Sequence, residues 1–245
     1  MKPIRDLGGS ELLELVRRGE LDDMQTLEVL RNPYCPVSAV EHLLLHRHGF
    51  GSHAVRELVA GFPGLQVGKA LNLLATLPWL SLLHVAQNPR TQPLVRRRAE
   101  QTLIQRTPNM TPGELIALAR RAHRPLMMTL CQSADDRVQI ALLDNPLLVE
   151  NDILITLNRG HASSRFLWSI FRHQKWGQYY RVRLAVAVQP NAPLPLAVSA
   201  LVQLKTTDLV KISKREDLVA EVRNAAWALV ERRREVAAGS GRIRQ

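Results

Sequence analysis

The residues best suited to chemistry lie in one segment, His161 to Arg183, which reads HASSRFLWSIFRHQKWGQYYRVR. It holds six of the eleven aromatic residues of the chain and interleaves them with arginine and lysine. Aromatic rings can stack on nucleobases, gaining about 1 to 3 kcal/mol per base, while neighbouring cations bind phosphates. Rings at helical spacing are also typical of a hydrophobic core. The spacing favours the core and leaves three candidate stacking residues: Trp168, Trp176 and Tyr179.

Positive charge is the second feature of the sequence. The chain has 33 Lys and Arg against 22 Asp and Glu, a formal net charge of +11. Between Ile153 and Arg215 ten bases accompany a single acid, Asp208. Such a field attracts nucleic acid or an acidic protein partner, although a generally basic, solvated surface remains an open alternative. The candidate polyanion-binding residues are Arg96, Arg97, Arg98, Arg120, Arg121, Arg172, Lys175, Lys211, Lys214 and Arg215.

Catalytic and metal-binding motifs are absent from the sequence. It contains no phosphate-binding glycine loop, dinucleotide-binding turn, nucleophile elbow or zincin motif. His42, His46, His48 and His53 include one pair at i, i+4 spacing, but no cysteine or carboxylate completes a metal site. We therefore expect no catalytic residue, no metal and no cofactor.

A Val-Arg dipeptide recurs along the chain at intervals of about 40 residues, as in repeat proteins. After three of these positions an apolar stretch runs from the valine to a proline eight residues later, in VRELVAGFP, VQIALLDNP and VRLAVAVQP. Proline cannot continue a helix, so each stretch is expected to be a helix that ends there. The pattern predicts repeats of two or three short helices, with the arginines paired to nearby acids in structural roles. The dipeptide valines, one of them followed by Gln, are Val16, Val55, Val95, Val138, Val182 and Val222.

The composition favours helix packed on helix, because Leu, Ala and Val dominate and aromatic residues make up only 4%. We predict an all-α fold with a single domain over residues 1–236 and a flexible basic tail over 237–245. The helices are expected near residues 10–19, 22–31, 36–47, 52–61, 65–76, 78–87, 92–106, 112–122, 125–132, 136–144, 149–158, 163–173, 176–189, 194–204, 206–213 and 217–235.

Three segments resemble known helical repeats. DLVAEVRNAAWALVERR is similar to the second helix of a HEAT-like repeat, and DDRVQIALLDNP and YRVRLAVAVQP resemble units of leucine-rich-repeat variants. The resemblance implies an α-solenoid, a right-handed superhelix of about six degenerate HEAT-like repeats with a concave binding face. One leucine-rich-repeat-variant relative carries an iron–sulfur cluster on N-terminal cysteines, which this sequence lacks.

In length, basicity and repeat count the chain is also similar to bacterial HEAT-like alkylpurine DNA glycosylases. Those enzymes hold the damaged nucleotide among Trp, Asp and Arg side chains on a concave surface. The residues that this analogy of fold points to are Trp79, Trp168, Trp176 and Asp208.

The location of the protein is suggested by its cysteines and its apolar runs. Cys35 and Cys131 stand alone, which fits a reducing compartment, and the N-terminus lacks the apolar core of a signal peptide. Two uncharged runs, Ala70–Pro89 and Leu184–Leu204, approach the length of a membrane span but are broken by proline. We expect a cytoplasmic protein that does not enter membranes.

These patterns together predict a non-enzymatic binding module. The leading hypothesis is recognition of nucleic acid through a basic, Arg-rich face, with little sequence selectivity. The alternative is an adaptor or scaffold whose groove takes an acidic or helical protein segment. A DNA glycosylase is the third alternative, by analogy of fold.

Overall fold

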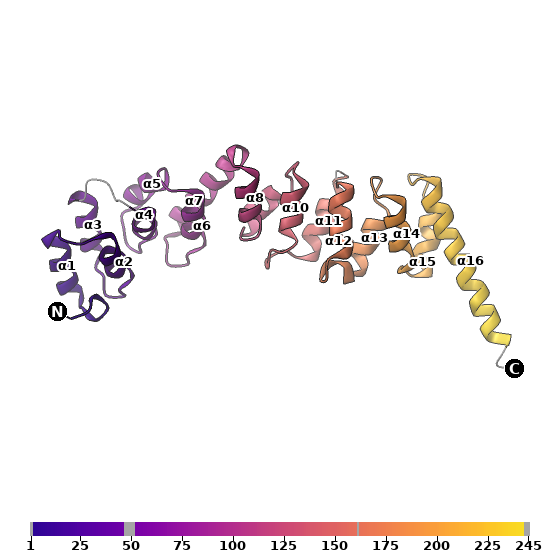
Figure 1. Cartoon of the computed structure of the whole chain (residues 1–245), viewed down its shortest axis with the longest axis horizontal. Coiled ribbons are helices and arrows are strands. Elements are labelled where there is room, and N and C mark those ends of the chain that lie inside the picture. Colours follow the sequence, from indigo (N-terminus) through magenta and orange to yellow (C-terminus); the bar gives the residue numbers. More distant parts are fainter. Residues whose placement is uncertain (1, 47–51, 161, 243–245) are drawn as a thin grey trace. The chain divides into compact units, whose positions relative to one another are not determined.

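The computed structural model describes residues 2–46, 52–160 and 162–242 (Figure 1). The chain divides into two compact units, unit 1 over Met1–Met110 and unit 2 over Thr111–Gln245. The single domain over residues 1–236 stays a prediction.

Unit 1 is helical throughout its described residues. Its elements are η1 (Ile4–Asp6), α1 (Gly9–Arg18), α2 (Asp23–Arg31), α3 (Val37–His46), α4 (His53–Ala60), α5 (Val67–Leu74), α6 (Trp79–Gln87), α7 (Pro93–Arg106) and η2 (Thr107–Asn109), where η marks a 3-10 helix. Second neighbours along the chain pack together: α1 on α3, α2 on α4, α4 on α6 and α5 on α7. The turns between the helices therefore return the chain onto the previous layer.

Unit 2 continues with the same kind of short helices. Its elements are α8 (Pro112–Ala119), α9 (Arg124–Leu130), α10 (Asp136–Leu142), α11 (Glu150–Asn158), α12 (Ser164–Arg172), η3 (Trp176–Gln178), α13 (Tyr180–Ala187), α14 (Leu194–Val202), α15 (Thr206–Ser213) and α16 (Ala220–Arg242). Second neighbours again pack together: α8 on α10, α10 on α12, α11 on α13 and α14 on α16. The last helix reaches Arg242 and so covers most of the predicted tail, whereas residues 243–245 lie outside the described residues.

The recurring valines mark every third helix. They lie on α1, α4, α7, α10, α13 and α16, and each is at most 5% exposed. A unit of about 40 residues therefore contains three helices, with the valine in the core of the first. No strand occurs among the described residues, and the chain is all-α and helical-repeat-like. The right-handed superhelix stays a prediction.

The arginines beside these valines differ from expectation. Arg56 contacts the ring nitrogen of His53 at 2.9 Å, and Arg183 donates from Nε to the carbonyl oxygen of Gly177. None of the five, which include Arg17, Arg96 and Arg223, forms an ion pair with a described residue. The expected pairing with acids is therefore wrong: Arg56 and Arg183 use a ring nitrogen and a carbonyl oxygen, Arg17 is exposed, and the Nε atoms of Arg96 and Arg223 are buried without a hydrogen-bond partner.

Asparagine and glutamine before proline connect successive layers. Asn145 is 2% exposed and donates from Nδ2 to the carbonyl oxygens of Ala119 and Ala122, at the end of α8, at 2.7 and 2.9 Å. Its Oδ1 accepts the backbone N–H of Leu147. Asn32 caps the end of η1 in the same way, and Gln189 caps α11. These side chains satisfy carbonyls that helix ends leave unpaired.

Two arginines, whose side chains are longer, also donate hydrogen bonds to carbonyls at helix ends. In unit 1, Arg106 donates to the carbonyl oxygens of Leu77 and Ala75, beyond the end of α5. In unit 2, Arg233 donates to those of Leu204 and Val202, at the end of α14. A cation at a helix C-terminus also complements the negative end of the helix dipole. Part of the basic excess therefore serves the fold.

The uncharged runs are interrupted where the sequence indicates. Pro78 separates α5 from α6, and Pro190 and Pro193 lie between α13 and α14. Of the helices in the described ranges, none has both the length and the apolar character needed to cross a membrane.

Candidate nucleic-acid interface

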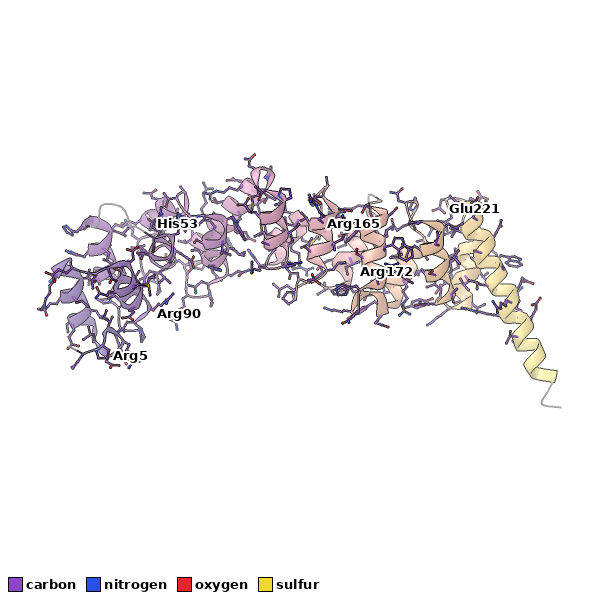
Figure 2. All side chains as sticks on the ribbon, viewed as in Figure 1. Arg5, His53, Arg90, Arg165, Arg172 and Glu221 are labelled. Carbon is purple, nitrogen blue, oxygen red and sulfur yellow. The ribbon has the colours of Figure 1, made fainter. Side chains whose placement is uncertain are left out.

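The aromatic and basic segment forms α12, the short η3 and the start of α13. Ser163 begins α12 by accepting the N–H of Phe166, and the helix ends at Arg172, before η3. Figure 2 labels Arg165 and Arg172, near the two ends of α12. Gly177 of η3 lies against the carbonyl oxygen of Phe171, so closely that a Cβ atom would clash there. The segment therefore turns tightly enough to bring its rings together.

One of the three candidate stacking residues belongs to the core. Trp176 is 1% exposed, and its indole N–H donates to the carbonyl oxygen of Leu143 at 2.9 Å. It cannot offer its ring to a base, so its assignment as a stacking residue is wrong. Trp168 is half-buried against Phe171, and Tyr179 is 38% exposed with its ring 5.6 Å from that of Trp176. Tyr179 is therefore the most accessible of the three.

Three cations of this region lie over aromatic rings. The Arg172 guanidinium is 4.6 Å from the ring centre of Trp168, and the Lys175 ammonium is 4.0 Å from that of Trp176. The Lys205 ammonium, from the residue before α15, is 5.3 Å from the ring of Tyr180. A contact of this kind stabilises the position of the cation by about 0.5 to 1 kcal/mol at an exposed site and leaves its charge uncompensated. We call Arg172, Lys175 and Lys205, with the rings under them, the aromatic–cation patch.

The only acid of this part of the sequence is held in a hydrogen-bond network. The Tyr180 hydroxyl donates to Asp208 Oδ2 and accepts the backbone N–H of Lys205, and the Lys211 ammonium lies 3.3 Å from Asp208 Oδ1. The hydrogen bond from Tyr180, followed by the attraction of Lys211, lowers the pKa of Asp208 below its ordinary 3.8. Asp208 is therefore ionised at neutral pH. Its carboxylate is stabilised by the hydrogen bond from Tyr180 and by the nearby ammonium of Lys211.

Beside the patch, α11, α13 and α15 line a groove of about 520 Å³ within unit 2. Arg181, Lys211 and Arg215 contribute cations to it, and Asp208 contributes a carboxylate. Arg181 is exposed and forms no ion pair with a described residue, whereas Arg215 pairs with Asp217. Cations thus continue from the patch into this groove.

The remaining predicted cations of unit 2 lie at helix ends. Arg120 follows α8, exposed, 3.8 Å from Asp144, which also lies 3.7 Å from His173 after α12. Arg121 is exposed next to it. Lys214 follows α15 and makes no ion pair with a described residue. Surface pairs such as that of Arg120 contribute about 0.2 to 1 kcal/mol, so these cations can exchange partners.

The predicted arginines of unit 1 lie together on α7. Arg97 and Arg98 are exposed and form no ion pair with a described residue. Arg96 is half-buried, and its Nε is buried without a hydrogen-bond partner. They belong to a different unit from the other seven predicted cations, so a continuous stripe over all ten stays a prediction.

The histidines form no metal site in the part of the chain that the structure describes. The rings of His42 and His46 stack with centres 4.2 Å apart, and His53 contacts Arg56. No group of three or more His, Cys, Asp or Glu able to hold a metal occurs among the described residues. His48 lies outside them. The pair His42 and His46 serves as an aromatic contact.

The glycosylase residues are dispersed as far as the structure places them. Asp208 lines the groove, but neither Trp168 nor Trp176 does. Trp79 begins α6 in unit 1. Within unit 2, Asp208 thus has a tyrosine and a lysine as neighbours and no tryptophan in its groove.

Two residues of the interface were not among the predicted binding residues. Lys205 approaches Tyr180 from 25 positions away, and Arg181 shares a groove with residues of α11 and α15. Both lie in the stretch with one acid, and that charge bias was the available signal. Their grouping depends on contacts between helices, which spacing along one helix does not show.

Comparison with known proteins gives no relative: no family model matches the chain, and no curated protein and no solved structure is similar to it. The HEAT-like and leucine-rich-repeat-variant resemblances therefore stay predictions.

Proposed function

We propose that the protein is a nucleic-acid-binding module without catalytic activity, and that unit 2 contacts phosphates through the aromatic–cation patch. The observation behind this proposal is that Arg172, Lys175 and Lys205 are held over rings and form no ion pair with a described residue. Their charge is thus uncompensated yet fixed in position, as a phosphate site requires. Tyr179, exposed beside the ring of Trp176 over which Lys175 lies, offers a ring on which a base can stack.

The charge balance of the unit supports a polyanion as the ligand. Unit 2 has 20 Lys and Arg against 12 Asp and Glu, a net charge of +8, whereas unit 1 has 13 against 10, a net charge of +3. A field of one sign raises the local concentration of phosphates. Contacts of this kind carry no base readout, so the binding is weakly sequence-selective.

Fluorescence anisotropy with a labelled single-stranded oligonucleotide at low salt tests the proposal. We expect a dissociation constant in the micromolar range or below, and at least a tenfold loss in the triple variant Arg172→Gln, Lys175→Gln, Lys205→Gln. The matched control removes three exposed cations elsewhere, through Arg18→Gln, Arg31→Gln and Arg232→Gln, and retains most of the affinity. No binding by the wild-type chain contradicts the proposal.

The glycosylase alternative stays a prediction with its own assay. It requires release of modified base from alkylated DNA by the purified full-length chain, and loss of that release in Asp208→Asn. Absence of release from the wild-type chain ends this alternative.

A further inference from the structure

The groove of unit 2 has a regular construction. Each of its three helices contributes positions i, i+3, i+4 and i+7, which form one face of an α-helix. Along α13 these positions start at Arg181 and end at Val188, the residue after the helix, and along α15 they start at Asp208 and end at Arg215, two residues after the helix. Such a face extends about 10 Å along the helix axis. The groove is therefore made of three matching stripes and is long enough for about two turns of a partner helix.

The floor of the groove is aliphatic. It contains Ile155 of α11, Leu184 and Ala185 of α13, and Val188, which follows α13, and all four are only partly buried. Apolar side chains that a protein leaves partly open in a hollow gain most from an apolar partner. A phosphate backbone gains nothing from this floor. None of the residues that line the groove is aromatic, so bases find no ring to stack on.

The rim of the groove is basic. Arg181, Lys211 and Arg215 line it together with one carboxylate, Asp208. Lys211 pairs with Asp208 and Arg215 pairs with Asp217, a residue outside the groove lining. Arg181 has no ion-pair partner among the described residues, and its exposed guanidinium can pair bidentately with a carboxylate. The occupant that complements an aliphatic floor and a cationic rim has an apolar stripe flanked by acids.

We infer that this groove binds an amphipathic α-helical segment of a partner protein, with Leu-like residues on the floor and Glu or Asp against Arg181. The site adjoins the aromatic–cation patch but shares no residue with it, and the inference does not depend on nucleic-acid binding by that patch. The partner helix supplies side chains at i, i+3, i+4 and i+7, the spacing of the groove itself.

A designed peptide serves as the probe. It is a fluorescein-labelled 18-residue helix with Leu at i, i+3, i+4 and i+7 and Glu on both sides of that stripe. Its control has the same composition with the leucines spread around the helix. We expect the full-length chain to bind the striped peptide at least tenfold more tightly than the control. Equal affinity for the two peptides, or no binding of the striped one, overturns the inference.

Groove variants locate the binding. Ala185→Trp fills the floor and Arg181→Glu reverses a rim charge, so each is expected to weaken the striped peptide at least tenfold. Arg232→Glu, an exposed position on α16, reverses a charge outside the groove and leaves the affinity within about twofold. Circular dichroism melts identify a variant that fails to fold, and Lys211→Gln then replaces it as a second rim variant.

The outcomes separate this inference from the proposed function. Loss of the three patch cations leaves peptide binding unchanged if the groove is an independent site. If a single-stranded oligonucleotide displaces the peptide and Ala185→Trp weakens the oligonucleotide equally, the groove is part of the nucleic-acid site and the inference fails. Peptide binding without any oligonucleotide binding supports the groove and contradicts the proposed function alone.

Discussion

At the scale of single residues, the chain uses similar side chains for different tasks, and the neighbours decide which. Arg233 caps a helix, Arg172 lies over a ring, and Arg181 lines a groove without an acid partner. Trp176 and Tyr179 are three residues apart, yet one is in the core and the other is exposed. Part of the basic composition thus serves stability, and the proposed function assigns another part to recognition.

Asn145 tests the connection between layers. Asn145→Ala removes two hydrogen bonds to carbonyls at the end of α8 and leaves those carbonyls buried, so we expect the free energy of unfolding to fall by about 1 to 3 kcal/mol. Urea denaturation followed by circular dichroism measures the change. Asn224→Ala, at an exposed position of α16, is the control and is expected to change stability by less than about 0.5 kcal/mol. Equal losses contradict the assigned role.

Cys35 gives a prediction for pH. Burial disfavours its thiolate and raises its pKa from the ordinary 9.0 to about 11. At pH 8 the folded chain therefore reacts slowly with a thiol reagent, and the rate increases until the pH exceeds about 11. The chain unfolded in urea reaches its plateau near the ordinary value. Peptide mapping by mass spectrometry distinguishes Cys35 from Cys131, and an equal rate in the folded and unfolded chain at pH 8 refutes the shift.

At the scale of elements, each short helix is stabilised by partners outside itself. The helices of unit 2 from α8 to α15 have seven to nine residues, too short to persist alone in water. Packing on second neighbours and the capping of C-terminal carbonyls from a later layer supply what the isolated helix lacks.

Arg233 and Arg232 provide a matched pair on α16. Arg233→Ala removes charge-assisted hydrogen bonds to the carbonyls of Leu204 and Val202, and we expect a loss of about 1.5 to 3 kcal/mol in the free energy of unfolding. Arg232 is exposed and forms no ion pair with a described residue, so Arg232→Ala is expected to cost less than about 0.5 kcal/mol. Chemical denaturation of both variants measures the two changes in the free energy of unfolding. Similar losses in the two variants contradict the capping role of Arg233 and indicate an effect of charge alone.

Local features of the fold are predictable from the sequence, because their partners are close along the chain. In the sequence TPGE, Thr111 and Glu114 form a capping box, with Glu114 accepting the N–H of Thr111, and Asp135 caps α10 by accepting the N–H of Arg137. The Val-Arg spacing predicts the repeat. The roles of Asn145 and Arg233 are not predictable in this way, because their acceptors lie 23 to 31 residues away.

The candidate site, too, is only partly predictable from the sequence. The sequence indicates the segment and its charge, but the same ring spacing suits a core and a stacking surface, so the burial of Trp176 does not follow from it. The groove needs one face from each of three helices, and that register depends on packing.

At the scale of the whole molecule, charge and composition favour one unit as the binding part. Unit 2 holds the larger basic excess, the aromatic–cation patch and the groove, whereas the predicted cations of unit 1 are the three arginines of α7. The proposed function is recognition of phosphates by position and charge, so salt is the variable that tests it most directly.

The most direct test is the slope of log affinity against log salt for a labelled single strand. Each neutralised phosphate of a single strand contributes about −0.7 to this slope, so removing Arg172, Lys175 and Lys205 together should make it shallower by about 2. The control triple variant Arg18→Gln, Arg31→Gln, Arg232→Gln should retain the wild-type slope. A slope that is the same in the patch variant and the wild-type chain contradicts the patch as the nucleic-acid interface.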